Sequence, residues 1–189
     1  MLQFVDVSDL LPERIELDYY VPLIIRWGEL DYIEPKNLMM LPPKLNWSIG
    51  DQRSLLEIGI DSKSGIIRVI KVVLAGRVTI QNSEFHINGR LPARSGMPIC
   101  KIDDWSSSVE LTSGYYREEK TFELHLGSNH VCVIFSDLDV VSQIVCGRVR
   151  FGLDLNNYLC LLEVVGFSGE EIEQLTETLR YQCLEADLA

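Results

Sequence analysis

The residues best placed to do chemistry are His130 and Cys132, in the stretch "HVCVIF". Alternate residues of a β-strand share one face, so an imidazole at this spacing can lie beside a thiol and take its proton, as in a cysteine hydrolase. The apolar residues around Cys132 favour a buried thiol instead, and burial opposes the ionisation that makes a thiol nucleophilic. The sequence also lacks the G-x-S-x-G, H-E-x-x-H, Walker and dinucleotide-binding motifs. We therefore predict no catalytic residues and a protein that is not an enzyme.

A metal site needs several ligands at compatible spacing, and the chain offers few. Asp137 and Asp139 form a D-x-D pair, but no third ligand stands near them, so a turn or a helix start is the favoured interpretation. The five cysteines are odd in number, widely spaced and without a C-x-x-C pair. This pattern favours reduced thiols in a cytoplasmic protein over a disulfide framework or a zinc site. We predict no metal and no cofactor.

Two stretches of the chain echo each other, "IGIDSKSGIIRVIKVV" and "FGLDLNNYLCLLEVV". Asp61 and Asp154 occupy the same place in the two patterns, and an aspartate at the start of a reversal accepts backbone N–H groups two or three residues on. Gly65 and Asn157 can supply a left-handed residue nearby. Each loop offers a single carboxylate, too few for a calcium loop. We interpret the repeat as a device that builds two hairpins, with a binding site as the alternative.

The acidic charge is concentrated at the two ends of the chain. Of the formal net charge of −11, residues 1–34 carry eight acids against two bases, a net of −6, and residues 168–189 carry six acids against one base, a net of −5. Phosphate binding needs clustered Lys and Arg, and the acidic ends offer the opposite charge. Nucleic acid is therefore excluded as a partner, and an anionic membrane is a poor one. A basic protein partner fits this charge, and acidic ends that merely aid solubility are the alternative.

The elements that must position these groups are mostly strands. We predict an α+β fold in one domain, made of mainly antiparallel β-sheets with a C-terminal amphipathic helix packed on the sheet. The expected parts are an irregular or short-helical segment at residues 1–37, a β-rich body at 38–166 and a helix at 168–184. Ser168 and Glu171 form an S-x-x-E capping box at the start of that helix. Apolar residues then recur at helical spacing, which leaves Glu170, Glu173 and Glu177 toward solvent.

The segment "LLEIGIDSKSGIIRVIKVVL" and the final "VRFGLDLNNYLCLLEVVGFSGEEIEQL" together resemble small bacterial immunity proteins, which are encoded beside polymorphic or contact-dependent growth-inhibition toxins. The resemblance covers about Leu55 to Leu179 and is one of pattern, without an invariant motif. It implies a cytoplasmic protein that binds and blocks one cognate toxin domain. Such toxins are often basic nucleases.

On this interpretation, carboxylates at both ends of the chain form the toxin-binding surface. The candidate residues are Glu29, Asp31, Glu34, Glu170, Glu173 and Glu177. This arrangement requires the two ends to adjoin. A stand-alone accessory or ligand-binding β-domain is the runner-up, and a hydrolase using Cys132 and His130 is a third interpretation.

Overall fold

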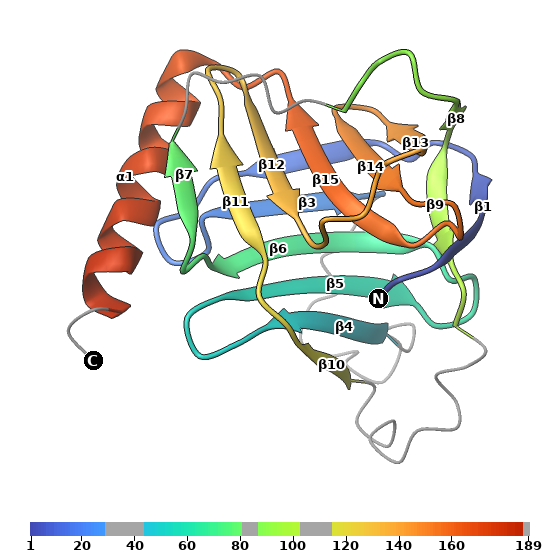
Figure 1. Cartoon of the computed structure of the whole chain (residues 1–189), viewed down its shortest axis with the longest axis horizontal. Coiled ribbons are helices and arrows are strands. Elements are labelled where there is room, and N and C mark those ends of the chain that lie inside the picture. Colours follow the sequence, from blue (N-terminus) through green and yellow to red (C-terminus); the bar gives the residue numbers. More distant parts are fainter. Residues whose placement is uncertain (29–43, 81–86, 103–114, 187–189) are drawn as a thin grey trace, which may run out of the picture.

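The computed structural model describes residues 1–28, 44–80, 87–102 and 115–186 (Figure 1). Strands fill most of this part of the chain, and one helix, α1 (Gly169–Ala186), follows the last strand. The strands in chain order are β1 (Phe4–Ser8), β2 (Glu13–Glu16), β3 (Leu23–Trp27), β4 (Lys44–Gly50), β5 (Leu55–Asp61), β6 (Ile67–Leu74), β7 (Val78–Ile80), β8 (Ala93–Ser95), β9 (Met97–Cys100), β10 (Tyr115–Glu119), β11 (Glu123–Leu126), β12 (His130–Ile134), β13 (Ser142–Cys146), β14 (Val149–Leu153) and β15 (Leu159–Val165).

These strands form two large sheets and a small one. A six-stranded sheet has the order β10-β4-β5-β6-β3-β2, a seven-stranded sheet has the order β7-β11-β12-β15-β14-β13-β8, and β1 pairs with β9. In Figure 1 the strands of one large sheet run across those of the other, as in orthogonally packed sandwiches. The consecutive strands β4, β5 and β6 are neighbours, whereas β15 lies between β12 and β14.

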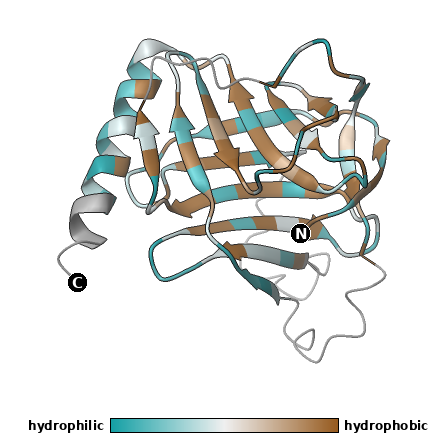
Figure 2. Ribbon diagram, in the orientation of Figure 1, coloured by the Kyte–Doolittle hydropathy of each residue, from teal (hydrophilic) through white to brown (hydrophobic). Residues whose placement is uncertain are grey.

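The core lies between the large sheets, and apolar residues recur along the strands of both (Figure 2). One cross-strand row of the six-stranded sheet contains Trp47, Ile58, Ile70 and Ile25, all with 2% exposure or less. The seven-stranded sheet presents its own buried row, which consists of Leu124, Val133, Leu162, Phe151 and Ile144. Both rows belong to one hydrophobic cluster.

Most strand pairings are antiparallel, as predicted, but the large sheets are mixed. Three pairings among the described strands are parallel: β10 with β4, β7 with β11, and β8 with β13. In each case the added strand lies at the edge of its sheet. Parallel neighbours need long connections, so these edge strands come from distant parts of the chain, which local sequence patterns do not reveal.

The N-terminal segment also differs from the expectation of an irregular or short-helical stretch, since it contains β1, β2 and β3. Pro12 and Pro22 each stand immediately before a strand. A proline is tolerated there because the ladder does not yet require its missing N–H group.

The two echoing segments form the hairpins β5–β6 and β14–β15. Asp61 Oδ1 accepts the N–H groups of Lys63 at 3.0 Å and Ser64 at 2.9 Å, and Gly65 has a φ of 74°. Asp154 Oδ1 accepts the N–H groups of Asn156 and Tyr158, both at 2.8 Å. The aspartates therefore hold the turns, as the hairpin interpretation predicts.

Candidate interaction surface

The structure describes three of the six predicted toxin-binding residues. Glu170, Glu173 and Glu177 are exposed on α1, as the helical periodicity predicts. The other three, Glu29, Asp31 and Glu34, lie outside the described residues. The predicted meeting of those three with the helix therefore stays a prediction.

Helix α1 begins where its capping sequence predicts. The Ser168 N–H donates to Glu171 Oε2 at 2.7 Å, and the Glu171 N–H donates to Ser168 Oγ at 3.2 Å. This reciprocal pair satisfies two donors that a helix start otherwise leaves open. The bond from the Ser168 backbone holds the pKa of Glu171 below its usual value. Leu175 and Leu179 are buried in the same cluster as the strands.

The exposed side of α1 carries a continuous line of side chains. Glu170, Glu173, Glu177 and Tyr181 recur at intervals of three and four residues, so they lie one above another on a single face. At about 1.5 Å of rise per residue, this line is about 16 Å long. We call these four residues the acidic stripe. Among the described residues, no ion pair engages its three carboxylates.

A cluster of exposed tyrosines adjoins the C-terminal end of the acidic stripe. The Tyr19 ring lies 5.2 Å from the ring of Tyr181 and 5.5 Å from that of Tyr20, centroid to centroid. Their exposed fractions are 50% for Tyr19, 80% for Tyr20 and 44% for Tyr181. This tyrosine cluster brings the β2–β3 turn onto α1, so the first and last parts of the chain do meet. Sequence reasoning missed it, because a contact between residues 19 and 181 has no local signal.

Side-chain contacts hold the β2–β3 turn in place. Asp18 Oδ1 accepts the N–H group of Tyr20 at 2.8 Å and that of Val21 at 3.3 Å. From the helix, the Gln182 amide donates to the Tyr20 carbonyl at 3.5 Å and to the Val73 carbonyl at 3.1 Å. The turn and the helix are thus tied both to each other and to β6.

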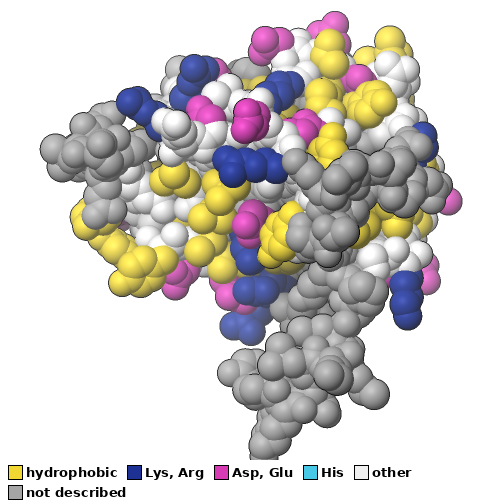
Figure 3. All heavy atoms as spheres, turned by 90° about the horizontal axis from the view of Figure 1, so that it is seen from below, with side chains coloured by type: hydrophobic (Ala, Val, Ile, Leu, Met, Phe, Trp, Pro, Cys, Tyr) yellow, Lys and Arg dark blue, Asp and Glu magenta, His cyan; other side chains and the backbone are white. Residues whose placement is uncertain are grey.

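Other N-terminal acids are engaged by groups of the same chain. Glu16 pairs with Arg14 at 3.1 Å and with Arg26 at 3.4 Å, and the Glu13 carboxylate accepts the backbone N–H of Arg148 at 3.0 Å. Figure 3 shows acidic and basic side chains interspersed on the face seen from below. These contacts partly neutralise the negative charge of the N-terminal segment.

The candidate catalytic pair is buried. Cys132 is fully buried, as the apolar run around it predicts, and His130, at the start of β12, is 3% exposed. Burial raises the pKa of the Cys132 thiol to about 12, and the neighbouring Glu163 carboxylate adds to this rise. Glu163 lies opposite Cys132 on β15, is itself fully buried and pairs with Arg150 at 3.2 Å. A thiol that stays protonated at neutral pH is poorly suited to nucleophilic attack.

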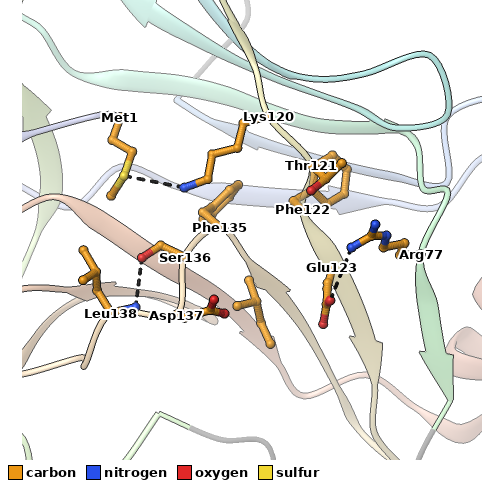
Figure 4. Close-up of a pocket in the computed structure, with 11 residues that line it drawn as sticks. Met1, Arg77, Lys120, Thr121, Phe122, Glu123, Phe135, Ser136, Asp137 and Leu138 are labelled. Carbon is orange, nitrogen blue, oxygen red and sulfur yellow. Dashed lines mark hydrogen bonds and ion pairs between the residues drawn. The ribbon is translucent and has the colours of Figure 1, made fainter.

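Two adjoining hollows open between β11, β12 and the segment that follows β12. Their volumes are about 470 and 450 Å³, and both are lined by Glu123, Ile134, Ser136, Asp137 and Leu138. Figure 4 shows the larger one, where Glu123 faces Arg77 at 3.9 Å. Asp137 and Asp139 are exposed beside these hollows, and the described residues contain no cluster of three or more metal-ligating side chains.

No protein-family model matches this chain, and the comparison with curated proteins finds no match either. Among the described residues, α1 is too polar to cross a lipid bilayer.

Proposed function

We propose that this protein binds and neutralises a cognate toxin domain with a basic surface, such as a nuclease, by covering that surface. The observation that carries the proposal is the acidic stripe, in which three exposed glutamates share one helix face and no described ion pair engages them. The net charge of −11 supports it, because a strongly acidic protein attracts a basic partner over a distance of many ångströms.

The spacing of the stripe suits mimicry of a nucleic-acid backbone. Successive carboxylates, from Glu170 to Glu173 to Glu177, stand about 4.5 and 6 Å apart along the helix axis. A nucleic-acid strand carries one phosphate charge about every 3.4 Å. Lysines and arginines that bind a phosphate backbone would therefore meet a comparable line of negative charge. Such complementarity acts mainly by speeding association and selecting the partner.

The experiment is a pull-down of the toxin encoded beside this protein, co-expressed with wild type or with the triple variant Glu170→Gln, Glu173→Gln, Glu177→Gln. At about 0.5 kcal/mol for each exposed charge, the variant should bind about tenfold more weakly in low salt. The matched control, Asp9→Asn, Glu119→Gln, Asp139→Asn, removes the same charge from exposed positions elsewhere.

The control should bind like wild type, and the wild-type affinity should fall as salt is added. An equal loss of affinity in both triple variants would show that the net charge of the protein alone drives toxin binding. Binding that is insensitive to salt and to the helix substitutions would overturn the proposed mechanism.

A second candidate function is favoured by the two hollows beside β11 and β12. Together they give a β-domain space for a small ligand, in which case the acidic stripe only aids solubility. Glu123→Ala, whose side chain lines both hollows, discriminates between the two candidates. If the protein neutralises a toxin, this substitution should leave toxin binding unchanged. If the protein binds a small ligand in the hollows, the substitution should abolish that binding.

A further inference from the structure

We infer that the tyrosine cluster is the centre of the contact with the partner and that it recognises arginine side chains in preference to lysine. This inference rests on the proposed function and specifies the chemistry of the partner surface. Tyr19 contacts both Tyr20 and Tyr181, and the three residues are 44% to 80% exposed, so they form an aromatic patch on the surface. Tyrosine is among the residues that most often dominate binding energy at protein interfaces.

The cluster is held ready for a partner. The Asp18 carboxylate fixes the turn that carries Tyr19 and Tyr20, and Gln182 ties that turn to α1 and β6. Ring contacts then hold Tyr19 between Tyr20 and Tyr181. Because these groups are already ordered, a partner that docks here loses little further conformational entropy.

The charges around the cluster select the occupant. Glu177 precedes Tyr181 by one helical turn on the same face, so an aromatic ring and a carboxylate stand next to each other. A guanidinium group can stack on the ring while its N–H groups bond the carboxylate in parallel. The compact lysine ammonium is more strongly hydrated and lacks the planar fork for this double contact. A partner surface that presents arginine therefore fits the site best.

The test compares nona-arginine and nona-lysine peptides by calorimetric titration of the full chain. Wild type should bind nona-arginine at least fivefold more tightly. The variant Tyr20→Ser, Tyr181→Ser should bind both peptides equally, within a factor of two. Tyr20→Phe, Tyr181→Phe keeps the rings and should retain the preference. Tyr115→Ser, which removes a tyrosine that is 55% exposed on β10, serves as the matched control and should behave like wild type.

The outcomes separate this inference from the proposed function. The triple glutamine variant should weaken the binding of both peptides and narrow the preference for arginine, because it removes the Glu177 carboxylate that the guanidinium group contacts. Equal binding of the two peptides by wild type, or loss of preference in Tyr115→Ser, would overturn the role of the cluster while toxin neutralisation could still stand. A preserved arginine preference in a protein that fails to neutralise the toxin would instead overturn the proposed function. Unchanged circular dichroism and melting temperature verify that each variant is folded.

Discussion

Replacing Gly65 with alanine should destabilise the protein by about 3 kcal/mol, because two separate costs meet at this residue. Gly65 has a φ of 74°, a left-handed conformation that costs an alanine about 1–2 kcal/mol. A Cβ atom there would lie 2.6 Å from the carbonyl oxygen of Cys100. That oxygen belongs to the backbone of β9, so making room for the methyl group should cost about 1–3 kcal/mol more. Alanine also makes the unfolded chain stiffer than glycine does, which offsets about 0.4–1 kcal/mol of this destabilisation.

Urea unfolding followed by tryptophan fluorescence measures this loss, and the melting temperature should fall by about 6–12 °C for a chain of this size. Gly89→Ala is the matched control, since nothing lies within 4 Å of the added atom and Gly89 is outside the left-handed region. It should leave stability unchanged or slightly raised. Asparagine tolerates the left-handed backbone but keeps the clash, so the stability of Gly65→Asn should lie between those of Gly65→Ala and Gly89→Ala. A Gly65→Ala protein as stable as wild type would refute this account of the turn.

Three further predictions concern the thiol, the helix cap and the acid response. Cys132 should resist labelling by a disulfide reagent at pH 8 in the folded protein and react after denaturation, because burial raises the pKa of its thiol to about 12; rapid labelling of the folded protein would contradict this. Ser168→Ala should cost about 1 kcal/mol in urea unfolding by removing the helix cap, and Ser168→Asp should recover most of it. Partial burial raises the pKa of Asp61, but the N–H groups of Ser64 and Lys63 outweigh this effect and hold the pKa below its usual value. The folded pKa is therefore below the unfolded one, so the stabilisation is present above about pH 4 and is lost as the pH falls through the folded pKa. The stability gap between wild type and Asp61→Asn should narrow in acid, and a gap that stays constant from pH 7 to pH 3 would exclude this linkage.

Features governed by short-range chemistry were predictable from the sequence. The Ser168–Glu171 box marks the helix start because both partners lie within one turn, and the two aspartate-led hairpins follow from bonds that span two to four residues. The exposure of Glu170, Glu173 and Glu177 follows from helical period alone. Each of these depends on residues that are neighbours in the chain.

Features that depend on distant pairing were not predictable. The strands β1, β2 and β3 were missed because no local pattern reveals the partners that each strand finds in space. The edge strands β7, β8 and β10 pair in parallel with segments from elsewhere in the chain. Tyr19 and Tyr181 become one cluster only after α1 packs beside the β2–β3 turn, and no pattern within either segment indicates that contact.

The position of β15 has a consequence for synthesis of the protein. This strand is the last one in the described chain, yet it lies in the middle of the seven-stranded sheet and joins β12 on one side to β14 on the other. During synthesis, the sheet is in two parts until residues 159–165 have emerged from the ribosome. Until then, the edges of β12 and β14 that pair with β15 stay open. We expect the nascent chain to be most prone to aggregation and most dependent on chaperones during this interval, since unpaired strand edges attract other chains.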